Sequence, residues 1–422
     1  MIVVATARRI FSSLRVPNYR LYFAGQAISL SGTWMQSVAQ GWLVLDLTGS
    51  GTAIGLVLAL QFLPVLLLGP LGGVLADRID KRRLLLGTQV AAALLAAALG
   101  LLVLLEVVTL WMVCAMACGL GFVNLVDNPT RQAFLGEMVG PDDLTNAISL
   151  NSVLVNLARV AGPAGAGALI ITVGVAPCFL INAASYLAAI AALLLIRPER
   201  LRRTAPRPRS RGQLRAGFRY VRANPAIFIP LLMMAVVGTL AYEFQVSLPL
   251  LARFTFGGDA DTYGAMTALM GAGAVVGGLL TAAAGRRAPT ALAAMALLFG
   301  AVQSVAALAP SRALALAAMV PLGASSIAFL ALGNATLQLA SAPEMRGRVM
   351  ALWAVAFLGS TPVGGPLIGW IGGLNPRWGL GVGGLATLLC GLLAWRPLAR
   401  LTPPENAPAP VAAEPAGPEA QA

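Results

Sequence analysis

The segment GPLGGVLADRIDKRR occupies residues 69–83 and connects two long apolar runs, 52–76 and 84–105. Each run is long enough to cross a hydrocarbon core of about 30 Å as a helix. Charged side chains are costly inside a bilayer, so the basic end of this segment belongs in a loop at the membrane surface. The segment therefore predicts two membrane-spanning helices with a short, positively charged loop between them.

Apolar runs of this kind recur along the whole chain. The sequence has 422 residues, of which 58% are hydrophobic and 11% are charged, whereas soluble domains carry about 25% charged residues. In lipid, a helix satisfies its own backbone hydrogen bonds, which permits many such runs. The expected spans are 19–45, 52–76, 84–105, 109–128, 146–171, 175–196, 225–252, 262–284, 289–309, 312–335, 349–373 and 378–396. We therefore predict an all-α membrane protein with twelve transmembrane helices.

The positive charge of the chain indicates its topology. The formal net charge is +13, with 29 basic residues. If both termini are cytoplasmic, every basic residue falls in a cytoplasmic segment except Arg159, Arg253, Arg312 and Arg377. Because this bias follows the positive-inside rule, we interpret the charge as topogenic and expect no nucleic acid partner. We predict a multi-pass protein of a bacterial inner membrane, whose first apolar segment is an uncleaved anchor.

The residue types argue against an enzyme and against bound cofactors. The sequence has no histidine, and its four cysteines lie in apolar stretches without metal-ligand spacing. It contains no Gly-Lys-Ser or Gly-Lys-Thr sequence, which argues against ATP as the energy source, and we find no nucleophile–base pair. Any proton coupling must therefore use carboxylates, and the expected energy source is a proton gradient.

Two features recur at nearly the same separation along the chain. The loop GGVLADRIDKRR at 72–83 is echoed by GGLLTAAAGRR at 277–287, and Gly162-Pro163 is echoed by Gly365-Pro366. Weak internal repeats are typical of transporters. We predict two related six-helix bundles, at 1–196 and 225–400, with a linker at 197–224 and a disordered tail at 401–422.

The linker is rich in arginine, and its second part has two distinct faces. If this part is helical, one face carries Arg215, Arg219 and Arg222 and the other carries Leu214, Phe218 and Val221. We predict an amphipathic helix on the inner leaflet, whose anionic lipids attract arginine. The alternative is a solvated linker.

The loop at 69–83 resembles a motif of the major facilitator superfamily, Gly-x-x-x-Asp-Arg-x-Gly-Arg-Arg, between helices 2 and 3. The matching residues are Gly73, Asp77, Arg78, Lys81 and Arg82, while Asp80 stands where the motif usually has glycine. Other stretches are similar to the enterobactin-exporter and macrolide-efflux branch of that superfamily. They are GTWMQSVAQGWLVLDLTGS, DNPTRQAFLGEMV, NSVLVNLARVAGP, GFRYVRANP and RGRVMAL.

The resemblance implies a central cavity lined mainly by helices 1, 4, 7 and 10. It also implies that Asp77 sits against the start of helix 11, where a helix N-terminus favours a carboxylate. A basic residue of the motif would pair with an acid at the end of helix 4, where Asp127 is the matching position. The alternative is that Asp77 and Arg78 only determine topology.

Gly162 and Pro163 resemble the start of a motif that antiporters carry in helix 5. That motif continues with a Gly-Gly pair, whereas this chain has Gly165 and Gly167. The departure weakens the inference of antiport. Small residues here still permit close helix approach, and generic packing is the alternative to a gate.

Polar side chains form stripes on several predicted spans. A polar stripe in a membrane helix should face the protein interior or an aqueous cavity. Helix 5 carries Ser149, Ser152, Asn156 and Arg159 at such a spacing, with packing between helices as the alternative for the serines, and helix 10 adds Ser326 and Asn334. The stripe of helix 1, with steps of three and four residues, consists of Gln26, Ser29, Thr33, Gln36 and Gln40.

Two charged residues lie deep inside predicted spans. An arginine at mid-bilayer costs about 3 kcal/mol or more, so Arg159 needs a structural partner, an aqueous cavity or a substrate anion. Glu243 lies mid-span beside Tyr242 and near Gln245, and is our first candidate for a proton or cation site. Asp46, at the outer end of helix 1, is the second; a solvated loop charge is the alternative.

These features predict a secondary transporter that exports an amphipathic small molecule, such as a siderophore, drug or peptide-like metabolite. Alternating access with proton antiport is the expected mechanism, and by analogy the protein is expected to be a monomer. One alternative is an importer or uncoupled facilitator, which would be insensitive to the proton gradient. A second is a non-transporting sensor or scaffold, which would need neither the loop motif nor the polar stripe.

Overall fold

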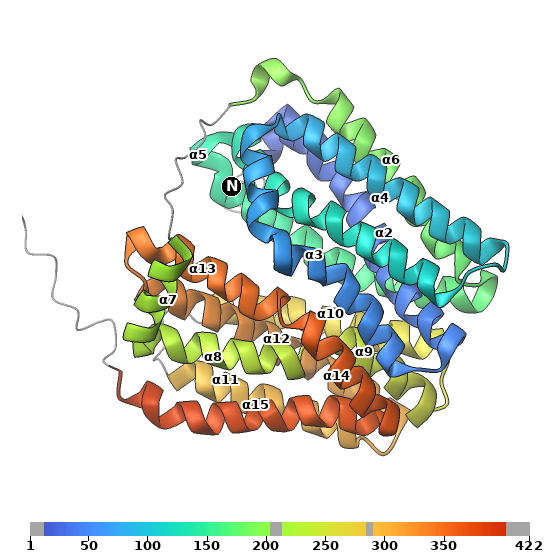
Figure 1. The fold of residues 1–422 in the computed structure, drawn as a ribbon, viewed down its shortest axis with the longest axis vertical. Helices are drawn as coiled ribbons and strands as arrows, with labels where there is room; N and C mark the ends of the chain where they lie inside the picture. Colours follow the sequence, from blue (N-terminus) through green and yellow to red (C-terminus); the bar gives the residue numbers. More distant parts are fainter. Residues whose placement is uncertain (1–11, 203–212, 284–289, 402–422) are drawn as a thin grey trace, which may run out of the picture.

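The computed structural model describes residues 12–202, 213–283 and 290–401. The regular elements of these ranges are all helices, and they form two groups that lie side by side (Figure 1). We call α2–α6 the first group and α8–α15 the second group. Four segments lie outside the described residues. They are residues 1–11, residues 203–212 of the linker, residues 284–289, which include Arg286 and Arg287 of the repeated loop, and the tail after 401.

The first group begins with a short 3-10 helix, η1 (Ser12–Arg15). It continues with α2 (Pro17–Thr48), α3 (Gly51–Arg78), α4 (Lys81–Leu104), α5 (Leu110–Val173) and α6 (Ala176–Leu195). Gly140 divides α5 into two spans, because its φ of +77° is a backbone conformation that glycine adopts readily and that interrupts a helix. The first group therefore supplies six spans.

The second group follows η2 (Pro198–Arg200) and the linker helix α7 (Gln213–Ala223). Two of its spans are broken, one between α8 and α9 and the other between α13 and α14. The elements are α8 (Pro225–Leu240), α9 (Phe244–Leu250), η3 (Leu251–Thr255, a π-helix), α10 (Ala260–Ala283), α11 (Thr290–Leu308), α12 (Arg312–Ala340), α13 (Pro343–Leu358), α14 (Thr361–Leu374) and α15 (Pro376–Ala399).

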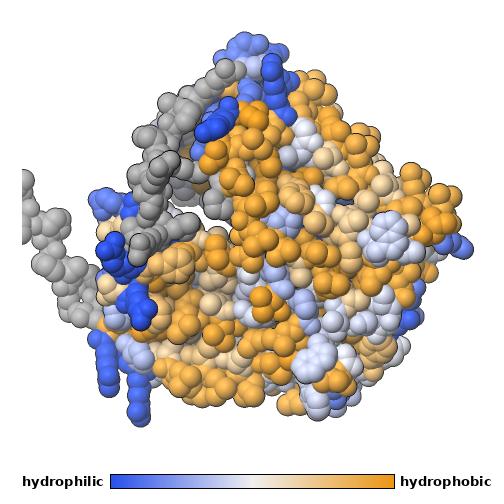
Figure 2. All heavy atoms as spheres, in the orientation of Figure 1, coloured by the Kyte–Doolittle hydropathy of each residue, from blue (hydrophilic) through white to orange (hydrophobic). Residues whose placement is uncertain are grey.

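The expected twelve spans are present as helices. Eleven helices or helix pairs of the described residues are long and apolar enough to cross a membrane. The twelfth is α2, which has 32 residues but is more polar because of its stripe. Figure 2 shows hydrophobic side chains covering much of the visible surface, while hydrophilic ones gather toward the end where α7 lies. This distribution suits a protein surrounded by lipid.

Helix starts follow local capping rules, and one of them explains a departure from the loop motif. The Asp80 side chain accepts a hydrogen bond from the backbone N–H of Arg83 at 3.0 Å and so caps α4. Ser50 caps α3 and Ser311 caps α12 in the same way. A side-chain acceptor at the N-cap stabilises a helix by about 1 kcal/mol. Asp80 therefore starts the helix that follows the loop.

Predicting 225–252 and 349–373 as continuous spans is wrong. Pro362 has no N–H to donate to a helical carbonyl, and α14 starts anew at Thr361. The carbonyl of Ala241, freed at the other break, accepts a hydrogen bond from Gln303 Nε2 at 3.2 Å. Broken helices are tolerated at membrane depth when such side chains satisfy the freed backbone.

The two groups touch where glycines allow their backbones to meet. A Cβ added at Gly55 of α3 would overlap the carbonyl of Gly365 in α14, and one at Gly264 of α10 would lie 2.8 Å from the Pro163 carbonyl of α5. Pro163 and the Gly365-Pro366 sequence thus lie at close contacts between the groups. Small residues commonly permit such close helix approach in membranes.

These contacts lie away from α7. The face that carries the α2–α3 turn is closed, whereas the groups diverge toward the face that carries α7 and the start of α13 (Figure 1). On the closed face, Arg253 of η3 donates a hydrogen bond to Asp46 of α2 at 2.9 Å, which links the two groups. The Arg253 guanidinium also lies over the Trp42 ring, 5.5 Å from its centroid.

The second part of the linker is helical, as expected. In α7, Val221 is buried, while Phe218 is 61% exposed and both Arg219 and Arg222 are exposed. The Tyr220 hydroxyl accepts a hydrogen bond from the backbone N–H of Ala342, just before α13, at 3.1 Å. The helix is therefore anchored to the second group by one side and presents two arginines and a phenylalanine outward.

Candidate functional site

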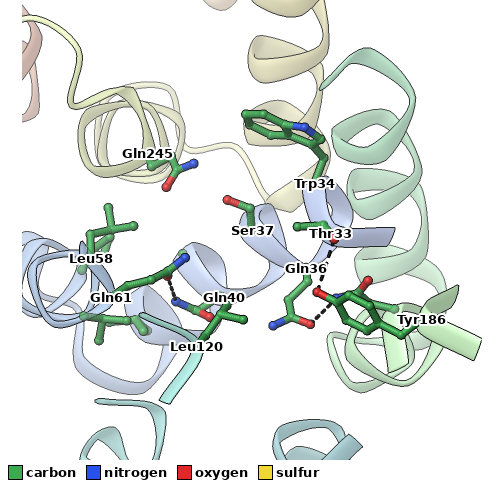
Figure 3. Close-up of a pocket in the computed structure, with 15 residues that line it drawn as sticks. Thr33, Trp34, Gln36, Ser37, Gln40, Leu58, Gln61, Leu120, Tyr186 and Gln245 are labelled. Carbon is green, nitrogen blue, oxygen red and sulfur yellow. Dashed lines mark hydrogen bonds between the residues drawn. The ribbon is translucent and has the colours of Figure 1, made fainter. Parts of the chain in front are cut away.

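A cavity of about 170 Å³ lies mainly among the helices of the first group and is lined by neutral polar and apolar side chains, with Gln245 of α9 added from the second group (Figure 3). Asn182 Nδ2 donates to Gln36 Oε1 at 2.6 Å, and Gln40 Nε2 donates to Gln61 Oε1 at 3.3 Å. The Thr33 and Tyr186 hydroxyls lie 3.4 Å apart. This polar cavity offers amide and hydroxyl groups to a ligand, but no charge.

A larger cavity of about 280 Å³ lies between the two groups. It shares Trp34, Ser37, Leu58 and Gln245 with the polar cavity, so the two lie next to each other. We call it the central cavity. Its first-group wall comes from α2, α3 and the second span of α5, and its second-group wall from the α8–α9 break, α10, α12 and the α13–α14 break. Its aromatic lining consists of Trp34, Phe62, Tyr242, Phe244, Tyr263 and Phe357.

This lining differs in part from the expected one. The first, seventh and tenth spans, which are α2, α8–α9 and α12, contribute as the resemblance implied. The fourth span, which is the first span of α5, supplies only Leu120, and that residue lines the polar cavity. The second span of α5 and α10 contribute instead. They do so because the two groups touch along α5 and α10, which places both helices beside the central cavity.

Glu243 lies at the break between α8 and α9, and its side chain lines the central cavity. The residue is 4% exposed. Its carboxyl group points toward α14, because a Cβ added at Gly364 would lie 2.9 Å from Glu243 Oε1. Within the described part of the chain, this oxygen has no hydrogen-bond partner. A buried carboxyl oxygen without a partner is costly and marks a site where a proton or ligand can bind.

Arg159 reaches the same cavity from the second span of α5. Its guanidinium group lies over the Trp34 ring, 4.8 Å from the centroid, which is a cation–π contact. The Arg159 Nε is buried without a hydrogen-bond partner among the residues described. The expected structural partner is therefore an aromatic ring, and no carboxylate of the described residues forms a salt bridge with Arg159.

Tyr242 and Ser326 are held together across the central cavity. The Tyr242 hydroxyl donates to the Ser326 carbonyl at 2.6 Å, and its ring packs edge-on against Phe357 at 5.3 Å. Both residues line the cavity, as does Gln245. These contacts join the α8–α9 break, where Glu243 lies, to α12 and α13.

Four of the expected cavity residues lie outside both cavities. Gln26 accepts a hydrogen bond from the Arg131 guanidinium, and Ser29 is buried with its carbonyl bonded to Thr33. Asn156 donates to the Ser152 carbonyl at 2.8 Å, and Asn334 bonds to Gln338 on its own helix. The helical period places residues on one face but does not tell how far along that face a cavity extends.

The loop motif forms its ion pair with an unexpected acid. Lys81 Nζ lies 2.7 Å from Glu137 Oε1, and both side chains are largely buried. Asp127 instead pairs with Arg131 at 2.6 Å and accepts hydrogen bonds from Thr88 and Gln89. The expectation that Asp127 is the partner of the motif is therefore wrong. Glu137 lies shortly before the break at Gly140, at the end of its span that faces the loop, and there its carboxyl group meets Lys81.

The remaining motif residues lie near the open face. Arg82 donates to the carbonyls of Leu193 and Leu194 at 2.7 and 2.9 Å, which satisfies the end of α6. Asp77 and Arg78 are exposed at the end of α3, and Gly73 is half-buried one turn earlier. In this open arrangement α3 meets α13 at the C-terminal end of α13, where a Cβ added at Gly359 would lie 2.7 Å from the Leu66 side chain.

Comparison with known proteins shows the family. A family model described as transmembrane secretion effector matches residues 9–414. The chain belongs to this family. It is thus a multi-pass member of the major facilitator superfamily of transporters and not an enzyme, as the sequence indicated.

Relatives of this transporter family include named exporters. The enterobactin exporter of Escherichia coli O139:H28 is 26% identical over 400 residues, which cover 92% of this chain and 95% of that protein. Macrolide efflux protein A of Streptococcus pyogenes is 23% identical, with coverage of 82% and 88%. The staphyloferrin A transporter of Staphylococcus aureus is 27% identical, but the match spans 62% of this chain and only 66% of that protein.

Solved structures show the same fold at low sequence identity. A bacterial homologue of the lysosomal transporter Spinster, in an inward-facing and unoccupied conformation, has a TM-score of 0.70 and is 16% identical, with coverage of 91% and 95%. A bacterial homologue of ferroportin, in an inward-facing state, has a TM-score of 0.69 and is 15% identical, with coverage of 91% and 99%. The twelve-helix major facilitator fold predicted from the sequence is therefore confirmed.

The sequence also contained signals for residues of this transporter that we did not single out. Gln61 and Asn182, which line the polar cavity, are isolated polar residues in otherwise apolar spans. Glu137 lies in DNPTRQAFLGEMV, a stretch that resembles the efflux branch. Tyr186 gives a weaker signal, because a tyrosine in an apolar span often only packs against its neighbours.

Proposed function

We propose that this transporter exports an amphipathic small molecule from the cytoplasm by alternating access, in exchange for protons. The observation that carries the proposal is Glu243, a carboxyl group buried at a helix break in a cavity between the two groups. Transporters commonly bind substrates and coupling ions near mid-membrane, at discontinuous helices. The relatives named as exporters of enterobactin and of macrolides support the direction.

We infer that the open face is cytoplasmic and that the membrane is a bacterial inner membrane. The described chain begins and ends on the face that carries α7, and the start of α4 lies there too (Figure 1). The start of α4 carries Lys81 and Arg82, and α7 carries Arg219 and Arg222. Basic residues favour the cytoplasmic side. In this orientation the cavity opens inward, and α7 lies at the inner leaflet, where Arg219 and Arg222 meet anionic lipid headgroups.

The central cavity suits an amphipathic molecule. Its walls combine six aromatic side chains with one arginine and one carboxyl group, and the polar cavity beside it offers amides. Binding sites of this kind hold a largely apolar ligand and orient it through a few polar groups. The chemistry therefore favours a substrate with an extended apolar or aromatic body and polar substituents.

The test is uptake into everted membrane vesicles, with a siderophore, a macrolide and a fluorescent dye as probes. The intact protein should accumulate at least one probe when respiration generates a proton gradient, and a protonophore should abolish the accumulation. Glu243→Gln should lose gradient-driven accumulation tenfold or more while it still binds the probe. Glu106→Gln, in an exposed turn, is the matched control and should transport like the intact protein.

Each alternative predicts a different result in this assay. An importer or uncoupled facilitator would equilibrate the probe in the presence of the protonophore, and a sensor or scaffold would move none of the probes. If Glu243→Gln kept full, protonophore-sensitive accumulation, the proton would have to be carried by another carboxylate. Asp46 is the weaker candidate, because in the structure it is paired with Arg253.

A further inference from the structure

Arg159 is a positive charge in the central cavity that has no carboxylate partner among the described residues. Four salt bridges join other basic residues of the described chain to acids, namely Lys81–Glu137, Arg131–Asp127, Arg253–Asp46 and Arg312–Asp261. The Arg159 guanidinium forms none with the described residues. A charge in a low-dielectric site needs a counter-charge or hydrogen bonds, so its partner has to come from outside the helices.

The contact with Trp34 leaves the hydrogen-bonding edge of Arg159 available. An aromatic ring covers one face of the guanidinium plane, whereas its five N–H donors point outward in the plane. Nε itself is buried without an acceptor among the described residues, so the part of the side chain that meets a ligand in the central cavity is the terminal pair of Nη atoms. A planar guanidinium edge matches an oxyanion, which can accept two parallel hydrogen bonds.

Glu243 does not supply the missing charge. It lines the same cavity, but no salt bridge joins it to Arg159, and its Oε1 also lacks a partner among the residues described. The Glu243 carboxyl group faces α14, near Gly364, whereas Arg159 lies over Trp34 of α2. The central cavity therefore holds two side chains of opposite charge, one on each wall, that do not pair with each other and that each keep one buried polar atom without a partner among the described residues.

We propose that Arg159 binds an anionic group of the transported molecule, which makes the substrate an amphipathic organic molecule with a carboxylate or similar oxyanion beside its aromatic or apolar body. This inference rests on the proposed function, because it assigns the substrate class of the same cavity. The anionic group pairs with Arg159, and Trp34 stacks beside it. A hydrogen-bond donor elsewhere on the substrate meets Glu243 and competes there with the exchanged proton.

The test measures binding of two fluorescent probes that differ in one group. Dansylglycine carries a carboxylate, and dansylglycinamide has the same aromatic body but is neutral. Binding to the purified protein at pH 7 is followed by dansyl fluorescence. The intact protein should bind the carboxylate at least tenfold more tightly than the amide, which is about the effect of one charge-assisted hydrogen-bonded pair.

Substitutions assign this preference to one side chain. In Arg159→Gln the two probes should bind within about twofold of each other, with the amide bound as in the intact protein, which also shows that the variant is folded. Arg159→Lys should keep part of the preference, since it retains the charge but loses the planar edge. Arg200→Gln, an exposed arginine outside both cavities, is the matched control and should keep all of it.

Three results would overturn the proposal: equal binding of both probes by the intact protein, no binding of either, or an unchanged preference in Arg159→Gln. The outcome is separable from the proposed function. If the carboxylate preference depends on Arg159 but no vesicle accumulates any probe, the anion site stands and proton-driven export fails. If accumulation depends on the proton gradient but the preference is absent, export stands and the anion site fails.

Discussion

At the scale of single residues, two kinds of buried charge can be distinguished among the described residues. Lys81, Glu137 and Asp127 are buried in pairs or networks, so their charges are neutralised within the first group. Arg159 and Glu243 line the central cavity without a salt-bridge partner among the described residues. Paired charges of the first kind support the fold, whereas unpaired ones stay available to ions and ligands.

The Lys81–Glu137 pair should contribute to stability. Lys81→Gln leaves the Glu137 carboxylate largely buried without its cation, which should cost about 1–3 kcal/mol and lower the thermal unfolding midpoint by several degrees. Adding Glu137→Gln to that variant should recover part of the loss. Arg312→Gln removes an exposed pair with Asp261 and should change the midpoint little. Equal, small shifts in the two single variants would show that the Lys81–Glu137 pair does not stabilise the fold.

At the scale of elements, some features follow from the sequence and others do not. The length of each apolar run predicts each span. The repeat of the Gly-Pro sequence in the two halves of the chain also agrees with the structure, because each copy contributes a residue where the two groups touch. The breaks beside Glu243 and Thr361 were not predicted, because the freed carbonyl of Ala241 is satisfied by Gln303, a residue far away in the chain. Likewise, the stripe on α2 predicts a polar face, but only three of its five residues, Thr33, Gln36 and Gln40, reach a cavity.

The glycine contact between α3 and α14 should be essential for the cycle. A Cβ at Gly55 would overlap the Gly365 carbonyl, so Gly55→Ala should prevent close contact on the closed face. We expect the transport rate in vesicles to fall at least tenfold. Gly69 lies in the same helix with open space around it, and Gly69→Ala should transport like the intact protein. Equal rates in the two variants would contradict a role for this contact.

At the scale of the whole molecule, the two helix groups meet on one face and diverge on the other. The closed face is held by the glycine contacts and by the Asp46–Arg253 pair, and the open face carries the loop motif and α7. Alternating access requires these two faces to exchange roles around the central cavity. The loop motif would then meet the start of α13 in the opposite state, as the resemblance implied for Asp77.

The most direct test of alternating access is the distance between spin labels on each face, measured by double electron–electron resonance. In a background without the four native cysteines, one pair replaces Arg83 and Glu344 on the open face, and another replaces Thr48 and Ser311 on the closed face. When the pH is raised from 5 to 8, the open-face distance should shorten while the closed-face distance lengthens. Glu243→Gln should abolish both changes. Two distances that stay constant at every pH, or that change in the same direction, would contradict proton-coupled alternating access.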